Sequence, residues 1–588
     1  MNGRSSSGST GRQGGTRISR RAILGAGLGA AALGWLQLAG MRRSTAAAGP
    51  LAFGPPFGPG RFSRWSGYPL LKLPDHGASI EVDGLPFSSG WTGDSFDPSA
   101  IPFHACENCF PSGEPPPPSE TVEVAIIGGG LSGLATAYAL RDRSIALLEL
   151  RDRMGGVSMG ERWNQVECSL GSAYFIVPDE GSELETLYRE LGVWPGARVA
   201  PGELTAEIDG AVVGDLLEWT GFTEDERAIV HKYAALVRHF ATEAYPEIPL
   251  PPGEKAQPVL DLDHNSLKLD LEARLGGPLP ARLAAAIQAY CYSSFGAGWQ
   301  SVSAAAGWNF VAAEEFGRIV LPGGNAGLAA ALWRAIAAGE QGRPRPALRP
   351  AHRAVDVRLD GDHVLVTRRR GDHFESIRAR HAVLANSKFI GKYMIHELET
   401  LDAEKRDAMD QVATHAYVVV NVLLRSPADR RFYDLFLLDG KEFPMDELAA
   451  ESEVRVMDVI DAGFGDEPTP GHSILTLYWP LPWPTGRASL IVDESWFVYA
   501  KKLVPQLRKI LRLLDIDPGS VEQVRMSRWA HSMPIATTGA MVEGICERLR
   551  RPIADRIWFV NQDNWLLPAV ETCLLEALHF AAKIRERL

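Results

Sequence analysis

The sequence predicts an α/β fold built on a Rossmann-like dinucleotide-binding domain, for three reasons. Residues 122–149 read as a strand, a glycine turn, a helix and a second strand that ends in an acid, which is the first βαβ unit of such a domain. Residues 184–309 show helical periodicity. An apolar strand, an acid and a helix follow one another within 557–584. With 588 residues, the chain is long enough for two interleaved domains and extensions.

At each glycine position of the first turn, glycine is needed for a physical reason. Gly128 makes the tight turn, Gly130 lets backbone N–H groups approach a pyrophosphate, and Gly133 lets the helix pack closely on the strand. Glu149 stands where an acid accepts hydrogen bonds from an adenosine ribose. The predicted nucleotide-binding set also includes the neighbouring residues Leu131, Ser132 and Leu150. A glycine turn alone could arise by chance, but the flanking strands and the acid favour nucleotide binding.

The residues after Glu149 indicate the kind of nucleotide. Arg151, Arg153, Gly155 and Gly156 complete the pattern E-x-R-x-R-x-G-G. This pattern resembles the signature of the flavin-dependent amine oxidase superfamily, in which the loop continues the FAD site. The resemblance implies FAD as cofactor. It also implies a Rossmann-like FAD-binding domain of the GR2, or amine oxidase, type, interleaved with an α+β substrate domain. The family usually has an arginine after the paired glycines, where this chain has valine.

Later segments resemble the other pieces of the FAD site in this family. There, a small-residue segment passes the flavin ring, two strands lie beside the nucleotide, an acid contacts the ribityl chain, and a helix N-terminus faces the electron-rich end of the flavin. The matching positions are Gly171, Ser172, Ala173, Val355, Ala385, Asp563, Ala569 and Val570. Without the family, the glycine would be a plain turn and the aspartate a helix cap.

The substrate side resembles one branch of the family, the spermidine dehydrogenases. Residues 528–531 (RWAH) fall where those enzymes have a W-x-H strand in the active site. Trp529 and His531 are therefore candidate active-site residues, with Tyr174 and Trp565 as further wall candidates. Each of the four could instead be a packed core residue.

Two features of the family's active site are missing. Many amine oxidases hold a lysine above flavin N5, but the corresponding strand has no lysine near Val419. The tyrosine that forms half of the family's aromatic cage aligns with Ala569. Because that lysine is linked to oxygen reactivity in relatives, its absence favours a dehydrogenase that passes electrons to another acceptor, which the sequence does not identify.

The N-terminus reads as an export signal. Residues 1–48 contain seven arginines and no acid, and residues 19–24 (SRRAIL) resemble a twin-arginine motif ahead of a mildly apolar run and three alanines. We expect the twin-arginine machinery to export the folded protein to the periplasm or beyond the cell. An uncleaved anchor is the alternative. No other stretch is apolar over a length that spans a bilayer.

Composition and charge indicate which ligands and partners are expected. The formal charge is −12, and without residues 1–48 it becomes −19, from 53 basic and 72 acidic residues. An acidic surface can attract cationic substrates, although a solvated acidic face is a more common explanation; nucleic acid is not an expected partner. Cys106 and Cys109 could form a local disulfide. No metal site is expected, because this pair lacks two further ligands.

The expected organisation follows from these segments. It comprises a signal peptide at 1–48, a Pro/Gly-rich arm without sustained period at 49–120, FAD-binding segments at 121–185, 311–400 and 526–588, and substrate-domain segments at 186–310 (mainly helical) and 401–525.

The sequence thus predicts an exported FAD-dependent oxidoreductase that oxidises a small-molecule amine by hydride transfer to the flavin, with a polyamine such as spermidine as one candidate. Amino-acid oxidation and carbon-chain desaturation by the same fold remain alternatives. A third is a non-catalytic exported flavoprotein that acts as a binding or assembly partner, because Val157 and the missing lysine and tyrosine depart from the family.

Overall fold

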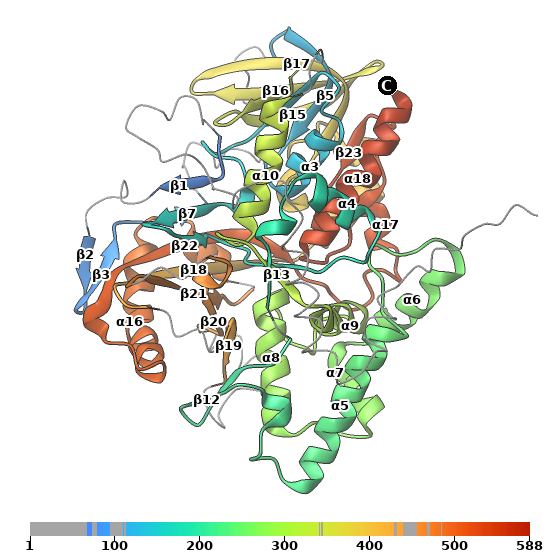
Figure 1. Ribbon diagram of the computed structural model, residues 1–588. Helices are drawn as coiled ribbons and strands as arrows, with labels where there is room; N and C mark the ends of the chain where they lie inside the picture. Colours follow the sequence, from blue (N-terminus) through green and yellow to red (C-terminus); the bar gives the residue numbers. More distant parts are fainter. Residues whose placement is uncertain are drawn as a thin grey trace, which may run out of the picture.

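The computed structural model describes residues 67–72, 79–94, 110, 113–200, 202–339, 342, 345–427, 432–438, 455–466, 471–483 and 485–588. The predicted signal peptide and the pair Cys106 and Cys109 lie outside these residues. Within them, a nucleotide-binding sheet lies at one end of the molecule, and a second sheet and a helical part lie at the other end (Figure 1).

The first sheet carries the glycine turn. In the described part of the chain it has seven strands in the order β14-β6-β5-β17-β16-β15, with β23 beside β17. The central strand β5 runs parallel to β6 and β17, as a Rossmann-like sheet requires. The strands are β5 (Pro118–Ile127), β6 (Ile145–Leu148), β14 (Ala347–Arg349), β15 (Arg353–Asp360), β16 (His363–Arg370), β17 (His373–Leu384) and β23 (Ile557–Phe559).

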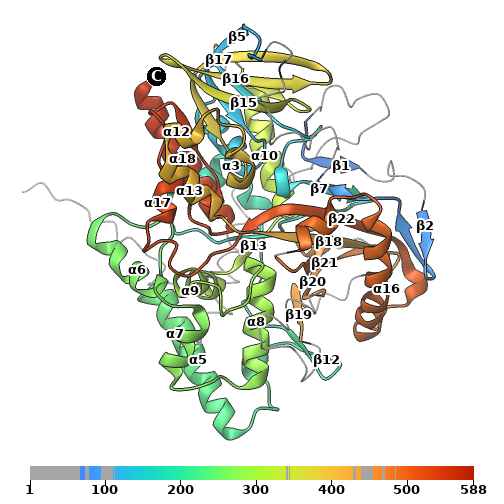
Figure 2. The same ribbon diagram turned by 180° about the vertical axis from the view of Figure 1, so that it is seen from behind.

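Helices pack on both sides of this sheet (Figure 2). Helix α3 follows the glycine turn and contacts α10 and α18, and the three share one apolar core with β5 and β6. The bounds are α3 (Leu131–Ala139), α4 (Glu183–Glu190), α10 (Asn325–Ala338), α11 (Lys388–Gly391), α12 (Leu398–Leu401), α13 (Ala403–Asp410), α17 (Ile545–Arg550) and α18 (Val570–Arg587).

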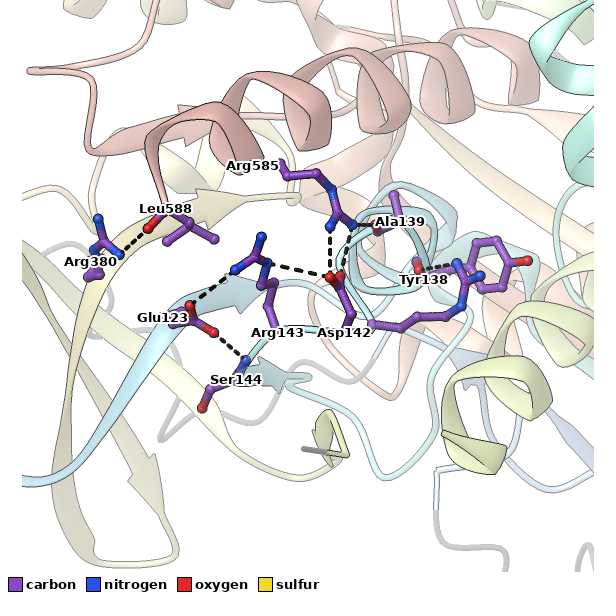
Figure 3. Close-up of polar contacts among 10 residues, drawn as sticks. Glu123, Tyr138, Ala139, Asp142, Arg143, Ser144, Arg380, Arg585 and Leu588 are labelled. Carbon is purple, nitrogen blue, oxygen red and sulfur yellow. Dashed lines mark hydrogen bonds and ion pairs between the residues drawn. The ribbon is translucent and has the colours of Figure 1, made fainter. Parts of the chain in front are cut away.

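The C-terminal helix α18 is tied down at its far end. Arg585 donates to the Asp142 carboxylate at 2.8 Å, and Arg380 donates to the Leu588 carbonyl at 2.7 Å (Figure 3). Beside them, the Glu123 carboxylate accepts from the Ser144 backbone N–H at 2.8 Å. The first contact holds the C-terminal end of α18 against the α3–β6 connection, the second holds it against β17, and the third joins that connection to β5.

The second sheet is longer and mostly antiparallel. Its order in the described residues is β12-β11-β19-β20-β21-β18-β22-β3-β2, with β4 beside β22. Helices α15 (Gly486–Leu490) and α16 (Ser495–Leu513) cover its outer side. The strands are β2 (Ser79–Val82), β3 (Leu85–Ser88), β4 (Thr92–Gly93), β11 (Ala206–Ile208), β12 (Ala211–Val213), β18 (Thr414–Leu424), β19 (Asp434–Leu437), β20 (Asp458–Asp461), β21 (Ser473–Pro480) and β22 (Val521–Pro534).

The middle of the chain is helical, as its periodicity predicts. Helix α5 begins with a capping box formed by Thr223 and Glu226. Helix α9 packs against α5, α6 and α7. The bounds are α5 (Glu224–Thr242), α6 (Gln257–Asp263), α7 (Leu267–Leu275), α8 (Ala281–Phe295) and α9 (Ala304–Ala313). The chain returns to the nucleotide-binding part through a small sheet of β9 (Phe175–Ile176), β10 (Arg198–Ala200) and β13 (Arg318–Val320).

The described part of the arm is not irregular: it contains short strands that the sequence pattern does not predict. Strand β1 (Leu70–Lys72) pairs with β7 (Gly160–Trp163), which pairs with β8 (Val166–Ser169). Strands β3 and β4 pair with β22. Such short strands carry no period of their own, because their hydrogen bonds go to distant strands. Strand β22 also shows that the expected boundary at 525/526 falls inside a strand.

A fully buried ion pair links the nucleotide-binding part to the second sheet. Arg525 in β22 donates to both oxygens of Glu161 in β7, at 2.6 and 2.8 Å. The two side chains are 1% and 0% exposed. Water therefore cannot replace either partner, and the loss of one leaves the other charge buried without its paired hydrogen bonds.

We predict that Arg525→Met lowers the free energy of unfolding by about 3–5 kcal/mol, because the Glu161 carboxylate stays buried without its partner. Denaturant unfolding measures the change. Arg406→Met removes a partly exposed pair with Asp410 and is the matched control, with an expected loss of at most about 1 kcal/mol. Equal losses in the two variants would contradict a stabilising role for the buried pair.

Candidate functional site

One cavity of about 820 Å³ runs from the glycine turn to the second sheet. Most residues predicted to bind the nucleotide or the flavin line it, although they come from separate segments of the chain. These are Gly128, Gly130, Leu131, Ser132, Glu149, Leu150, Arg151, Gly155, Gly156, Gly171, Ser172, Ala173, Ala385, Asp563, Ala569 and Val570.

The glycine turn brings three elements into backbone contact. Gly128 has φ +106°, and a Cβ on it would lie 2.7 Å from the Ala385 carbonyl oxygen at the end of β17. A Cβ on Gly133 would lie 1.8 Å from the Gly128 carbonyl oxygen. Neither position tolerates a side chain. Helix α3 therefore begins close to β5 and β17, and Gly130 at its start provides no side-chain cap. Its first N–H groups suit an anionic ligand.

Glu149 joins the glycine turn to the loop that follows β6. Its carboxylate accepts the Gly129 N–H at 2.7 Å and the Arg151 N–H at 2.8 Å, and its side chain is buried. Arg151 in turn is paired with Asp94 from the arm. Burial lowers the pKa of Arg151, but the charges of Asp94 and Glu149 outweigh this effect and raise it. This end of the cavity therefore presents a fixed set of charges.

Three predicted cofactor residues do not line the cavity. Gly133 lies behind the turn, where its role is close packing. Arg153 donates to the Gly160 carbonyl at 3.2 Å. Val355 packs against Phe110, whereas its neighbour Ala354 lines the cavity. For Val355 the prediction is off by one position: Arg353 and Ala354 line the cavity, and the strand pairing is irregular between Ala354 and Asp356, where Val355 lies.

The second sheet forms a wall of the cavity. Trp529 and His531 lie two residues apart in β22 and therefore face the same side, together with Tyr417 of β18 and Tyr478 of β21. The Trp529 indole donates to the Leu170 carbonyl at 2.7 Å. His531 Nδ1 lies 2.7 Å from the Thr414 hydroxyl, and its ring stacks on Phe389 at 4.2 Å. Hydrogen bonds and stacking thus orient both predicted side chains.

Val419 lines the cavity in the strand where the family has its lysine. No lysine lines the cavity anywhere in the described ranges. Ala569 lines it at the position of the expected cage tyrosine.

Trp565 does not line the cavity, so its prediction as a wall residue is corrected. Its indole donates to Glu576 in α18 at 3.0 Å, and Arg550 lies over its ring at 4.8 Å. The side chain thus packs between α17 and α18. Tyr174, the fourth candidate, does line the cavity, and its hydroxyl donates to Glu314 at 3.2 Å.

The end of the cavity beyond the sheet wall is acidic. Three carboxylates line it: Glu314, Asp434 and Asp458. Arg318 is the counter-charge, paired with Asp434 and 3.1 Å from Glu314. Four aromatic side chains surround this group, namely Tyr174, Tyr290, Tyr433 and Tyr478. Three acids against one arginine leave a formal excess of two negative charges.

Asp458 is the least compensated of these acids. It is 4% exposed; its Oδ2 accepts from the Ser293 hydroxyl at 3.2 Å, while its Oδ1 makes no well-formed hydrogen bond within the described residues. Burial raises the pKa of Asp458 well above its usual range, and the charge of Asp434 raises it further. Burial also raises the pKa of Glu314, although Arg318 opposes the shift. A bound cation would relieve both effects.

A further side of the cavity is basic. Arg487 of α15 lines it beside Tyr393 and Ile491, with its guanidinium 4.4 Å from the centre of the Phe389 ring. Burial lowers the pKa of Arg487. Its Nε is buried and makes no hydrogen bond in the part of the chain that the structure describes.

Sequence reasoning missed Asp94, Glu314, Asp458 and Arg487. None belongs to a local motif, and each reaches the cavity through the pairing of distant segments. Asp94 accepts the Ala530 N–H at 2.8 Å because β4 pairs with β22. Only Glu314 has a sequence signal, its spacing of four from Arg318, although the structure places Glu314 in a 3-10 turn and Arg318 in β13 rather than on one helix.

Comparison with known proteins supports this description. Residues 126–191 match the family described as NAD(P)-binding Rossmann-like domain. The chain is 21% identical over 552 residues to Oxidoreductase PigB of a Serratia species, covering 83% of this chain and 78% of that protein. A stretch of 73 residues is 38% identical to coproporphyrinogen III oxidase of Mycobacterium tuberculosis, covering 12% of this chain and 16% of that protein.

Two solved structures resemble this one over most of its length. A redesigned variant of putrescine oxidase has a TM-score of 0.59 and 17% identity, covering 80% of this chain and 100% of that chain. Cyclohexylamine oxidase from Brevibacterium oxydans has a TM-score of 0.56 and 18% identity, covering 80% and 99%. The predicted α/β fold with a Rossmann-like domain is confirmed, and the chain has the fold of the flavin amine oxidases.

Proposed function

We propose that this protein is an FAD-dependent oxidoreductase that oxidises an amine carrying a second cationic group, such as a polyamine. The observation that carries the proposal is the cavity itself. It joins the glycine turn to an end where three carboxylates and several tyrosines surround one arginine. Buried excess negative charge of this kind favours a cationic ligand. The names of the two amine oxidases with this fold agree with that chemistry.

The residues present fit FAD. Gly130 lines the cavity at the start of α3, and the nearest atom to a Cβ on it would be the Gly156 Cα at 3.9 Å, so the backbone there is open to a ligand. Gly171 also lines the cavity, where it packs directly on the Val157 backbone. Glu149 and Asp563 line the cavity at the expected positions. Bound FAD would accept the hydride from the carbon next to the substrate nitrogen.

The chain's own residues would orient the amine and exclude water. Trp529, Tyr417 and Tyr478 form a rigid aromatic wall, each side chain fixed by a hydrogen bond to a backbone carbonyl. Asp458 and Glu314 would hold the ammonium group that lies far from the reacting carbon. Binding would then not require a charge on the reacting nitrogen, which could be neutral. With Val419 in the lysine's position, we further propose a dehydrogenase with an acceptor other than oxygen.

Export is part of the proposal. The twin-arginine pattern in residues 1–48 supports delivery of the folded, FAD-loaded protein to the periplasm or the exterior by the twin-arginine machinery.

Arg487 favours a second candidate function. Its buried Nε and its position on the cavity wall suit a substrate carboxylate, so amino-acid oxidation stays a competing proposal. Carbon-chain desaturation is less favoured, because a long apolar chain would leave the formal excess of two negative charges at the acidic end uncompensated. If no substrate reduces the flavin, the alternative of a non-catalytic flavoprotein is favoured.

We predict that anaerobic mixing with spermidine or putrescine bleaches the flavin absorbance, whereas a monoamine of equal length reduces it more slowly. The second ammonium group lets the acidic end hold the substrate. Flavin absorbance after mixing is the measurement. Bleaching by amino acids alone would favour amino-acid oxidation. Bleaching by neither class of substrate would contradict both amine oxidation and amino-acid oxidation.

We predict that Asp458→Asn raises the KM for a diamine about 30-fold, roughly 2 kcal/mol, with a much smaller effect on a monoamine. Asp461→Asn changes an acid in the same strand that does not line the cavity, and it is the matched control. Equal changes for diamine and monoamine would contradict recognition of the second cation.

Comparison of the parent protein with the Asp458→Asn variant also tests the pH dependence of diamine binding. Because burial raises the pKa of Asp458, its carboxylate binds a cation only above that raised pKa. Diamine affinity should therefore rise with pH in the parent protein, and this rise should be smaller in Asp458→Asn.

We predict that Gly171→Ala greatly reduces bound flavin, because the new methyl group displaces the backbone at Val157 beside the cavity. Gly214→Ala is the control, since nothing lies within 4 Å of its new Cβ. The ratio of flavin to protein absorbance measures the content, and circular dichroism checks the fold. Full flavin content in a folded Gly171→Ala protein would remove this segment from the FAD site.

A further inference from the structure

Two segments that are far apart in the sequence run side by side along the cavity wall. Strands β17 and β23 pair in parallel with Leu384 opposite Phe559, and the Val560 N–H donates to the Leu384 carbonyl at 2.9 Å. Both chains continue beyond the carboxyl ends of their strands, where Rossmann-like sheets bind nucleotides. Residues 385–387 and 561–563 all line the cavity there.

Lys388 joins these two segments through hydrogen bonds. Its backbone N–H, which has no partner inside the first turn of α11, donates to the Asp563 carboxylate at 2.8 Å. Its ammonium group donates to the amide oxygen of Asn561, and the amide nitrogen of Asn561 donates to the Asn386 carbonyl at 3.0 Å. Both ends of the Asn561 amide are therefore fixed. Lys388 does not line the cavity, but Asn561 and Asp563 do.

The Lys388 ammonium is a buried positive charge. The side chain is 1% exposed, and within the described ranges it forms no ion pair with a carboxylate. Burial lowers the pKa of Lys388 to about 8, while the charges of Asp563 and Glu576 oppose the shift. At neutral pH the ammonium therefore keeps its proton in most molecules. Because lysine is almost never fully buried without a partner charge, this charge calls for a partner in the cavity.

A second buried lysine contacts the same aromatic ring but has its polar partners elsewhere. The ammonium of Lys405 in α13 lies 3.9 Å from the centre of the Phe559 ring, and that of Lys388 lies 5.6 Å from it. Lys405 donates to the Arg548 and Leu549 carbonyls near the end of α17, at 2.7 and 3.0 Å. Neither of these residues lines the cavity. Burial and the charge of Lys388 lower the pKa of Lys405 to about 6, so most of it is neutral at neutral pH.

The cofactor that fits this cavity is an anion. The pyrophosphate of FAD is negatively charged, and uptake of a hydride by the flavin adds a further negative charge. Asp563 places a carboxylate in the same wall; it is 3% exposed and forms no ion pair among the residues that the structure describes. A fixed positive charge behind this wall offsets the carboxylate and favours the more negative form of a bound ligand.

We propose that Lys388 is a positioning residue for FAD. Its hydrogen bonds hold Asn561 and Asp563 in the cavity wall, and its buried charge stabilises the bound cofactor, more in the reduced than in the oxidised form. The inference rests on the FAD binding of the proposed function and not on the identity of the substrate. Loss of the charge should therefore lower the reduction potential of the bound flavin, and loss of the hydrogen bond should loosen the cofactor.

The test compares two neutral variants in the full-length holoprotein. Lys388→Met removes the charge and the hydrogen bond, whereas Lys388→Gln removes the charge and keeps a side-chain donor toward Asn561. In both variants we expect the reduced flavin to bind about tenfold more weakly relative to the oxidised flavin, which lowers the midpoint potential by about 30 mV for a two-electron couple. Slow anaerobic reduction beside a reference dye at neutral pH measures this potential without any amine.

Release of FAD separates the hydrogen bond from the charge. After dilution, flavin fluorescence should show release about tenfold faster from Lys388→Met than from the parent, with Lys388→Gln closer to the parent. Lys405→Met is the matched control, because it removes a buried lysine from the same ring without changing a cavity-lining partner. It should leave the potential and the release rate unchanged.

Circular dichroism checks the fold of each variant, and if Lys388→Met does not fold, the potential of Lys388→Gln decides. An unchanged potential in the folded Lys388 variants, or an equal shift in Lys405→Met, would overturn the proposal. A parent protein that binds no flavin would overturn both this proposal and the proposed function. If the potential shifts as expected while no amine reduces the flavin, the role of Lys388 stands and amine oxidation fails.

Discussion

The backbone contact among Gly128, Gly133 and Ala385 is the constraint on which the cavity depends. A carbonyl oxygen stands where a Cβ would be on both glycines, so β5, α3 and β17 meet with no side chain between them. This contact places the first turn of α3 at the carboxyl ends of three parallel strands, where Rossmann-like sheets bind nucleotides. The segments carrying Gly171 and Asp563 reach the same cavity through longer connections.

The second sheet supplies what the glycine turn lacks, namely a wall and a charge pattern. Its pleat sends Trp529 and His531 toward the cavity, while Arg528, just before Trp529, turns to the other face and pairs with Asp493. The buried pair of Glu161 and Arg525 joins this sheet to the nucleotide-binding part. The relative position of wall and turn is therefore set by a contact that is costly to break.

The helices and strands that the sequence predicts are those with local signals. The capping box at Thr223 starts α5, and alternating or apolar runs mark β5, β18 and β23. The failures also have local causes. Val355 lies one position beyond Arg353 and Ala354, which line the cavity, at an irregularity in the strand pairing that no local pattern marks. Trp565 lies in a turn before α18, where no period indicates the direction of a side chain.

The sequence by itself determined the nucleotide-binding turn and the order of its elements, because glycine spacing and apolar periodicity act over a few residues. The tertiary structure alone decided which acids share the far end of the cavity. Glu314, Asp434 and Asp458 lie up to 144 positions apart, and only the packing of the turn after α9 against β19 and β20 brings their charges together. Burial then gives those charges properties that no local pattern encodes, since desolvation depends on what surrounds a group.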